Sequence, residues 1–582
     1  MQKVFRFFIQ NPVIVLIILV IPSFISLVRP GFFSMHDDLQ AFRIHQMHKC
    51  IQDFQIPCRW VPDMGYQYGY PQYNYYPHSV YYLGEAFHLA GFQFIDSVKI
   101  VFVLGFLVSA LTMFLFLKDF LSRWSALIGA LVYTYIPYKA VNVYVRGALN
   151  EFWTLAFYPL LFWSSWKIIK QGGRKNVAFF AISTCLILIT HNLMTLIFLP
   201  VLGTWILLNV FLEKNYKSLI SIILGGVLGI GLAAFFTIPV FLEQSYAHLE
   251  TLVGGYFDYR QHFVSLYQLF ISNYWGYDSS VWGIEDGLSL STGPIQVVGT
   301  ALTIIIAALS FKKFRKLSII TFVLAFLELI VLFMVHQRSA PLWTIFESAL
   351  IFIQFPWRFL SISVFLLSTL CAIGIFFLEK LDFRLLKIKA STLYGIVLLL
   401  SCLIMYLPFF QPKEWFNIND SDKFSGKSWE KQLTISIFDY LPIYAKLPPT
   451  SAAPMNPETL EGFADFKSSI VGSNFKAWEV DVTEKSLLRA PMFDFPGMKV
   501  FVDGKLVNHW NNDCRNQEYC LGLVTFNIEP GRHYILIKLI NTPVRTIGNV
   551  LTILSFLILI VLLFPINKQS LSARKYFKKW LD

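Results

Sequence analysis

Charged residues are scarce in this chain, and cysteines are few. Only 14% of the 582 residues are charged, whereas 55% are hydrophobic and 57 are phenylalanines. The mean hydropathy of +0.56 is correspondingly high. One soluble core could not bury so much apolar surface, so the composition excludes a soluble enzyme. Internal repeats and low-complexity runs are also lacking.

The apolar residues form long runs. The clearest of these runs are residues 13–28, 100–117, 219–242, 359–378 and 547–566. At ~1.5 Å per helical residue, each is about long enough to cross the hydrocarbon core of a bilayer. Counted along the whole chain, such runs predict a polytopic α-helical membrane protein with about 12 transmembrane helices. The first run is longer than the apolar region of a signal peptide and no small-residue cleavage site follows it, so we interpret it as a span.

Positive charge gathers in the short connections on one side of these spans. The segments are 1–12, 118–123, 167–176, 213–217, 312–316, 379–389 and 567–582. Together these 65 residues hold 23 of the 48 Lys and Arg but only 5 of the 36 Asp and Glu. Because cytoplasmic loops carry an excess of Lys and Arg, this side is predicted to be cytoplasmic, together with both termini. The basic excess therefore reflects topology, and we expect no nucleic-acid partner.

The remaining loops should lie outside. Residues 1–410 would form a transmembrane module with outer loops 29–97, 243–296 and 336–358, and residues 546–582 a last helix with a basic cytoplasmic tail. Between them, residues 411–545 alternate polar and apolar side chains and contain Asp503-Gly504, a hairpin signal. This predicts a small extracytoplasmic β-sandwich-like domain, whose role as a carbohydrate-binding unit, a lid or a spacer stays open.

The seven cysteines fit this topology. Three of them fall inside predicted spans, where a thiol acts as a small apolar side chain. The other four form two close pairs, Cys50 with Cys58 and Cys514 with Cys520, and both pairs fall in outer segments. An oxidising exterior favours disulfides at both pairs. The alternative is four unpaired thiols.

The first outer loop holds a group of acids and imidazoles. Residues 39–53 are predicted to form a helix at the membrane surface, just after Asp37 and Asp38. If the helix includes both acids, Asp37 shares a face with His48, and Asp38 shares one with His45. Carboxylates and imidazoles that converge in this way could perform acid–base chemistry. N-capping by the two aspartates is the alternative interpretation.

A metal centre is a weaker interpretation of the same loop. Its three nearest histidines, His36, His45 and His48, match no established ligand spacing. The cofactor is therefore unknown, and a divalent metal is neither required nor excluded by the sequence.

Aromatic residues crowd the second half of this loop. Six tyrosines lie among residues 65–78, together with glycines and prolines. Tyrosine rings stack on the C–H faces of sugars and their hydroxyls form hydrogen bonds, although single tyrosines also suit the membrane interface. The run as a whole predicts a shaped pocket wall.

Several motifs resemble a known family. They are Asp37-Asp38, Arg59-Trp60-x-Pro62-Asp63, Gly69-Tyr70-Pro71, Tyr75-Tyr76-Pro77, Tyr144-Val145-Arg146-Gly147-Ala148-x-x-Glu151, Tyr274-Trp275-Gly276-Tyr277 with residues 283–287, and Phe355-Pro356-Trp357-Arg358-Phe359. Over roughly residues 1–410 the chain resembles the prokaryotic membrane family labelled pyruvoyl-tetrahydropterin-synthase-related, of the GT-C glycosyltransferase superfamily. The zinc-binding histidines of the soluble synthase have no counterpart here, so the label does not imply pterin chemistry.

The resemblance implies a sugar transferase of the prokaryotic plasma membrane. Its donor would be a polyprenyl-phosphate sugar and its acceptor a glycan, a lipid or a protein, with the site on the outer face. The acidic residue of the first outer loop, which acts as base or orients the acceptor, matches Asp37, with Asp38 close behind. Relatives often carry a histidine four residues after the acid. This chain has Ala41 there, and His45 one turn later.

Two arginines at outer ends of spans complete the expected site. Arg146 and Arg358 lie where a lipid phosphate would be, and an arginine can bind phosphate through two parallel hydrogen bonds. Anchoring of the spans to lipid head groups is the alternative. Glu151 could be the salt-bridge partner of Arg146. The residues expected to line the pocket are His36, Tyr70, Tyr75, Tyr76, His78 and Glu151.

Two other classes of function remain open from the sequence. A transporter or flippase of lipid-linked sugars normally needs ionisable groups in mid-membrane, and the predicted spans contain almost none. A non-catalytic membrane protein that retains the fold would show the same pattern. The identity of the sugar, lipid and acceptor and the oligomeric state are not encoded in any motif.

Overall fold

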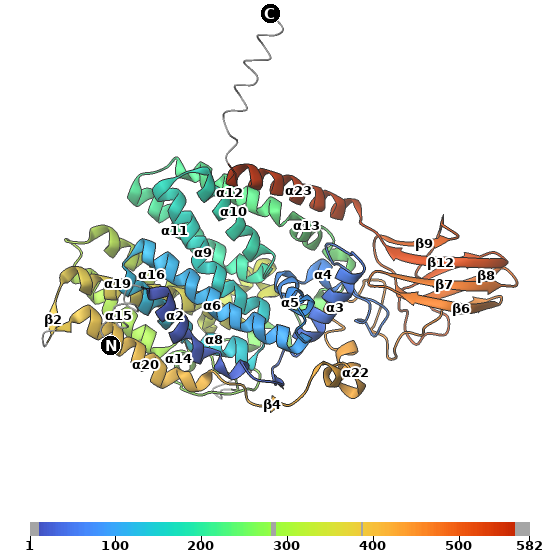
Figure 1. Cartoon of the computed structure of the whole chain (residues 1–582), viewed down its shortest axis with the longest axis horizontal. Helices are drawn as coiled ribbons and strands as arrows, with labels where there is room; N and C mark the ends of the chain where they lie inside the picture. Colours follow the sequence, from blue (N-terminus) through green and yellow to red (C-terminus); the bar gives the residue numbers. More distant parts are fainter. Residues whose placement is uncertain (1–10, 281–286, 386–387, 565–582) are drawn as a thin grey trace, which may run out of the picture.

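The computed structural model describes residues 11–280, 287–385 and 388–564. The chain forms a large body of helices with a small β domain at one end (Figure 1). Within these described ranges, six helical segments are long and apolar enough to cross a membrane: α6 (Phe94–Phe120), α11 (Asn192–Glu213), α16 (Arg315–Val335), η10 with α19 (Pro356–Leu381), α20 with η11 (Ala390–Phe409) and α23 (Pro543–Leu563). A bent pair of helices makes a seventh at most among the same residues.

The other expected spans also contain helices. These are α2 (Pro12–Val20), α7 (Arg123–Thr134), α9 (Leu149–Gln171), α10 (Arg174–Leu188) and α15 (Pro294–Leu309). Each is too short or not apolar enough throughout to meet the same test. A helical protein with several spans is therefore established in outline, and the number twelve stays a prediction.

The span expected at residues 219–242 is not continuous. Instead α12 (Ser218–Leu232) and α13 (Ala234–Leu242) meet at a bend of 76°. The bend is stable because other elements replace the lost helical hydrogen bonds: Phe235 N–H donates to Thr552 Oγ1 at 2.9 Å, and Phe235 C=O accepts from Arg59 Nη2 at 2.9 Å. A prediction from hydropathy cannot include these partners, since they come from distant segments.

Close packing of α13 on α23 accompanies the bend. A Cβ at Gly548 would lie 2.7 Å from the Ala234 carbonyl oxygen, so only glycine allows this approach. At the start of α23, the Arg545 Nε lies 2.9 Å from Glu243 Oε2, and both side chains are almost fully buried. The end of α13 is thus held to α23 by a buried ion pair.

Three of the basic turns lie together at one end of the bundle. Glu213, at the end of α11, is 2.8 Å from Lys170 of α9 and 3.3 Å from Lys316 of α16. The short hairpin of β2 (Arg384–Leu385) and β3 (Ile388–Lys389) lies at the end of the helical body opposite the β domain (Figure 1). This grouping agrees with one basic face. Residues 1–10 and the tail from 565 on lie outside the described residues.

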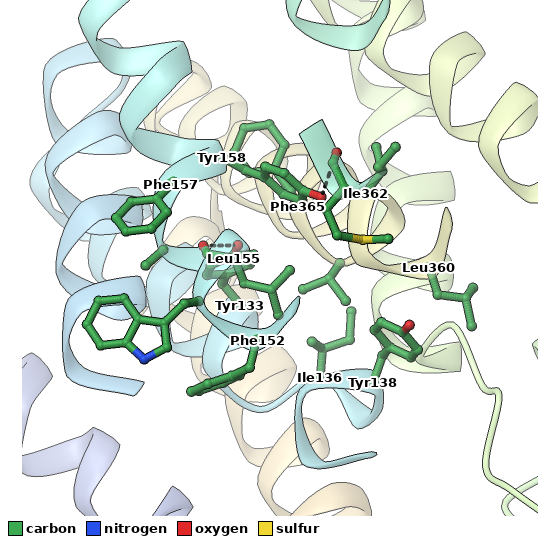
Figure 2. Packing of buried hydrophobic residues seen from close by; sticks show 14 of the residues in the cluster. Tyr133, Ile136, Tyr138, Phe152, Leu155, Phe157, Tyr158, Leu360, Ile362 and Phe365 are labelled. Atoms are coloured by element: carbon green, nitrogen blue, oxygen red, sulfur yellow. Dashed lines mark hydrogen bonds between the residues drawn. The ribbon is translucent and has the colours of Figure 1, made fainter. Parts of the chain in front are cut away.

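The α19 helix is at the centre of the helical body. Over the apolar window of Pro356–Leu381, 94% of the residues are buried. Figure 2 shows Phe365 and Ile362 of α19 beside Tyr158 of α9, whose hydroxyl lies 3.4 Å from Ser361 Oγ. This central packing fixes the position of the segment just before α19, which carries Arg358.

Glu328 and Lys139 are two of the ionisable groups that are buried in the helical body, where the sequence led us to expect almost none. The Glu328 carboxylate of α16 accepts a hydrogen bond from Ser363 Oγ. On α8 (Pro137–Ala140), Lys139 Nζ donates to Ser109 Oγ at 2.9 Å and lies 3.6 Å from the centre of the Tyr133 ring. Each group therefore has one hydroxyl partner from another helix.

The β domain has two antiparallel sheets. The five-stranded sheet has the order β10-β9-β12-β7-β6 and the three-stranded sheet the order β11-β8-β5. The strands are β5 (Glu458–Glu461), β6 (Ala464–Val471), β7 (Phe475–Val482), β8 (Ser486–Phe493), β9 (Met498–Val502), β10 (Lys505–Val507), β11 (Leu523–Ile528) and β12 (Gly531–Leu539). Asp503 and Gly504 form the expected hairpin turn with φ of 51° and 79°.

Of residues 411–457, the first part packs on the helical body, whereas Leu441 and Ala445 pack in the core of the β domain. Within them, β4 (Trp415–Phe416) pairs with β1 (Phe32–Phe33) of the first loop. The helices α21 (Asp420–Lys423) and α22 (Gly426–Thr434) follow. This stretch therefore covers the first loop before the chain enters the β domain.

Disulfides join Cys50 to Cys58 and Cys514 to Cys520. Cys50 and Cys58 are fully buried, whereas Cys514 is exposed. We expect a membrane-impermeant maleimide to label Cys514 and Cys520 on intact cells after reduction but not before, and to reach Cys50 and Cys58 only after denaturation as well.

The three remaining cysteines are the internal control for this labelling. Cys185, Cys371 and Cys402 are unpaired, and they should stay unlabelled in intact cells. The Cys514→Ser, Cys520→Ser double variant should abolish the signal that follows reduction. Labelling of Cys514 that requires permeabilised cells would place the β domain in the cytoplasm and reverse the predicted topology.

Candidate functional site

The turn before α3 (Gln40–Gln52) is held against the segment that precedes α9. The Asp37 N–H donates to the Arg146 carbonyl oxygen at 2.9 Å. Gly147 has a φ of +65°, and a Cβ there would lie 2.2 Å from Met35 Sδ, so the close approach of the two segments needs glycine. Main-chain contacts thus place Asp37 next to Arg146.

Glu151 joins the two predicted arginines. Its Oε2 lies 2.9 Å from Arg146 Nη2 and 3.5 Å from Arg358 Nε, and its Oε1 accepts a hydrogen bond of 2.6 Å from the Tyr138 hydroxyl. The Glu151 side chain is only 2% exposed, whereas each arginine side chain is 11% exposed. One buried carboxylate therefore balances two guanidinium groups whose side chains are slightly exposed.

Both guanidinium groups are fixed in place by further contacts. The Arg146 guanidinium lies 4.5 Å from the centre of the Trp357 ring. Arg358 Nη1 donates to the Ile353 carbonyl oxygen at 2.7 Å and to Gln354 Oε1 at 2.9 Å. Arg358 is in η10 (Pro356–Phe359), directly before α19 (Leu360–Leu381), as expected. Its charge and the positive end of the helix dipole favour an anion at the same point.

Asp37, which precedes α3, is exposed. It contributes to the electrostatic environment of Arg43, Arg146 and Arg358. Burial raises the pKa of Asp439 to about 6, Arg43 opposes the shift, and Asp37 adds to it. Arg43 Nη1 lies 3.1 Å from the Tyr76 hydroxyl, and its guanidinium is 4.2 Å from the Tyr76 ring centre.

Asp38 has a different environment. Its Oδ2 lies 2.6 Å from Lys423 Nζ, and the Lys423 side chain is 6% exposed. This ion pair connects the first loop to α21. Asp38 therefore helps to hold residues 411–457 over the first loop, which gives it a structural contact that Asp37 lacks.

The predicted sharing of helical faces by Asp37 and His48, and by Asp38 and His45, is wrong. The α3 helix begins at Gln40, its N-cap is Leu39, and no side chain caps it. Asp37 and Asp38 lie in the preceding turn, so the spacing of helical residues does not apply to them and the capping interpretation is also wrong. His48 Nδ1 is instead 2.8 Å from Glu85 Oε1 of α5 (Ser79–Leu89).

His45 lies in an aromatic pocket. Its ring stacks on Phe424 with a centroid distance of 4.8 Å, and its Nδ1 is 4.0 Å from Asp63 Oδ2. Burial, with a contribution from Lys49, lowers the pKa of His45 to about 4. Its contacts are not with the arginine cluster, so the geometry does not support the expected catalytic role.

Three of the expected pocket residues are part of the core. The Tyr70 hydroxyl donates to the Ser436 carbonyl oxygen at 3.1 Å, and the Tyr75 hydroxyl donates to the Glu243 carbonyl oxygen at 2.7 Å. His78 is 1% exposed, and burial lowers its pKa to about 3. These side chains fix the shape of the loop and do not line an open pocket.

The other expected pocket residues lie at the site. Tyr76 is partly exposed beside Arg43. The exposed His36 precedes Asp37, and its Nε2 lies 2.7 Å from the Tyr277 carbonyl oxygen. Tyr277 comes from the second outer loop, so this loop borders the site.

Sequence reasoning missed Arg43, Asp439 and His191. A single arginine in a predicted surface helix usually faces solvent, and Asp439 lies in a stretch without any motif. His191, between α10 and α11, could be interpreted as a turn residue. Burial and the nearby Arg358 lower its pKa to about 3. Only the tertiary structure reveals these three residues.

The site has no evident metal centre in the described ranges. Among residues 11–280, 287–385 and 388–564, no three His, Cys, Asp or Glu side chains are grouped so that they could hold a metal ion. The arrangement is instead an exposed carboxylate next to two cations and a tyrosine.

Residues 73–274 match the model of a family described as 6-pyruvoyl-tetrahydropterin synthase related domain; membrane protein. This stretch resembles that membrane family. The matched region includes Tyr76, Arg146 and Glu151, whereas Asp37 and Arg358 lie outside it. A search of curated proteins found no match. The match supports the family label that the motifs suggest, and it supports a membrane location.

Proposed function

We propose that this protein transfers a sugar from a polyprenyl-phosphate donor to an acceptor hydroxyl on the outer face of a prokaryotic plasma membrane. The observation that carries this proposal is the position of the exposed Asp37, whose N–H donates to the Arg146 carbonyl oxygen, beside two arginines that share one buried carboxylate, Glu151. The likeness of the motifs to the GT-C superfamily supports the same reaction.

In the proposed reaction, Asp37 and the two arginines have separate roles. An acceptor hydroxyl attacks the anomeric carbon, the bond from that carbon to the phosphate oxygen breaks, and Asp37 takes the proton of the hydroxyl. The polyprenyl phosphate leaves with the bonding electron pair, and the guanidinium groups of Arg146 and Arg358 stabilise its negative charge. The acceptor itself belongs to a glycan, a lipid or a protein.

The position of the arginines suits a lipid donor. Arg358 lies at the start of the apolar segment Pro356–Leu381, and Arg146 lies near the start of α9. In this arrangement the phosphate would lie at the membrane surface while the polyprenyl chain stays in the hydrocarbon layer. A soluble nucleotide sugar has no lipid chain, so a phosphate site at the start of an apolar helix would give it no additional binding.

The lipids that purify with the protein test this proposal. We expect mass spectrometry of the wild-type extract to show a polyprenyl-phosphate sugar, and Arg146→Gln to reduce its amount about tenfold, since the change removes one cation and leaves Glu151 paired with Arg358. Arg260→Gln is the matched control, because Arg260 of the second outer loop is exposed and pairs with Glu347 of the third. An extract with ordinary phospholipids alone, or equal polyprenyl phosphate in Arg146→Gln, would contradict the proposal.

A further inference from the structure

A cleft with a volume of about 220 Å³ opens in the β domain. Its lining includes residues of all three strands of the three-stranded sheet and of the extended chain before β5. Polar and aromatic side chains line it, and those that carry the argument are Tyr68, Glu458, Arg489, Asn516, Gln517 and Tyr519. None of these residues belongs to the Asp37 and arginine cluster.

A fixed set of donors and acceptors forms one wall of the cleft. Arg489 is 2% exposed at its side chain, and its Nη2 lies 2.5 Å from Glu458 Oε2. Its Nη1 donates to the Arg515 carbonyl oxygen at 2.6 Å. Glu458 Oε1 in turn accepts a hydrogen bond from Asn516 Nδ2 at 3.3 Å. Because Glu458 balances the charge of Arg489, this wall suits an uncharged, hydroxyl-rich ligand better than an anion.

The walls are also rigid. The Cys514–Cys520 disulfide closes the short loop that presents Asn516, Gln517 and Tyr519. Four prolines also line the cleft: Pro448, Pro449, Pro454 and Pro491. A preformed site of this kind loses little conformational entropy when it binds a ligand.

Two tyrosines supply aromatic surface. Tyr519 is 48% exposed, so one face is free to stack on a ligand. Tyr68 comes from the first outer loop and packs against Phe493 with a centroid distance of 5.4 Å. In the part of the chain that the structure describes, the Tyr68 hydroxyl has no hydrogen-bond partner. This hydroxyl can therefore donate to a ligand in the cleft.

We infer that this cleft is a binding site for an uncharged sugar residue of a glycan. Aromatic rings recognise the C–H face of a pyranose, and the carboxylate, guanidinium and amide groups recognise its hydroxyls. A lipid chain would place apolar surface against these polar side chains, and a phosphate would meet the Glu458 carboxylate. The inference concerns binding alone and does not depend on the proposed transfer reaction.

The cleft and the Asp37 site share two segments of chain. The first segment has Tyr68 at the cleft and Tyr76 at the site. The second has Asp439 at the site and Pro448 at the cleft. Hydrogen bonds from the Tyr70 hydroxyl to the carbonyl oxygens of residues 436 and 437 join the segments. A glycan held in the cleft would thus be anchored on the same framework as Asp37.

Equilibrium binding of fluorescent oligosaccharides to the full chain tests the inference. The probes are maltotriose, mannotriose and N,N′-diacetylchitobiose, in a detergent without a sugar head group. We expect at least one probe to bind, and Tyr519→Ala and Asn516→Ala each to weaken its binding about tenfold. Tyr534→Ala is the matched control, since Tyr534 is 43% exposed on β12 and does not line the cleft. It should bind as the wild type does.

The same experiment separates this inference from the transfer reaction. Asp37→Asn should bind the probe normally, because Asp37 does not line the cleft. The inference is overturned if no probe binds up to its solubility limit, or if Tyr519→Ala and Asn516→Ala bind as tightly as the wild type. It is also overturned if Asp37→Asn alone loses binding, because the sugar would then occupy the transfer site. A wild type that binds the probe but transfers no sugar would refute only the proposed reaction.

Discussion

Asp37→Asn should abolish sugar transfer by the reconstituted protein, with a loss in rate of at least about 100-fold. An amide of the same size cannot accept the proton of the acceptor hydroxyl. The change should not disturb the fold, because the Asp37 side chain is exposed and its main-chain N–H still donates to the Arg146 carbonyl oxygen at 2.9 Å. Initial rates of transfer and a thermal melt of the same samples measure the two properties.

Asp38→Asn is the natural control for this variant. It removes the charge that pairs with Lys423 at 2.6 Å, so it should lower thermal stability while it reduces transfer less than Asp37→Asn does. Full activity of Asp37→Asn would assign the base to another residue. Loss of activity that accompanies unfolding would give Asp37 a structural role instead.

Arg358→Ala should weaken donor binding about tenfold or more, and Arg358→Lys should weaken it less. Lysine keeps the charge but lacks the planar fork that binds two phosphate oxygens. Glu151 keeps Arg146 as its partner at 2.9 Å, so neither change leaves a buried carboxylate without a cation. The fold should therefore persist in both variants.

Donor affinity and membrane insertion, measured side by side, separate binding from anchoring. If Arg358 only anchors the helix to lipid head groups, lysine should be tolerated fully and alanine should reduce insertion. Arg260→Ala, at an exposed position in the second outer loop, should change neither quantity. Unchanged donor affinity in Arg358→Ala would refute its role at the phosphate.

The parts of the structure that depend on local sequence could be predicted. Apolar length gave the main helices, and alternation with turn signals gave the β domain. The motifs around Arg146 and Arg358 led to two side chains that Glu151 does bring together. The pattern of neighbouring residues determines each helix or strand. A charged side chain next to an apolar run is expected at the end of the span, and this is where Arg146 and Arg358 were placed.

The parts that depend on tertiary contacts could not be predicted. The helical spacing of Asp37 and His48 had no meaning, because a turn held by the Arg146 carbonyl oxygen comes before α3. Arg43 is buried by tyrosines of the same loop, which hydropathy cannot show. Burial of His45 and Tyr70 likewise comes from residues 411–457, far away in the sequence.

The bend between α12 and α13 has a consequence for biogenesis. Phe235 bonds with Arg59, made early in synthesis, and with Thr552, which lies 317 residues further along the chain. Main-chain groups without partners cost several kcal/mol in hydrocarbon. A nascent chain that has not reached α23 therefore holds α13 with an unpaired N–H, and Glu243 still lacks Arg545. The ribosome must therefore synthesise α23 before the region around the bend can reach its native hydrogen bonding. Folding of α13 cannot be completed while the chain ends before α23.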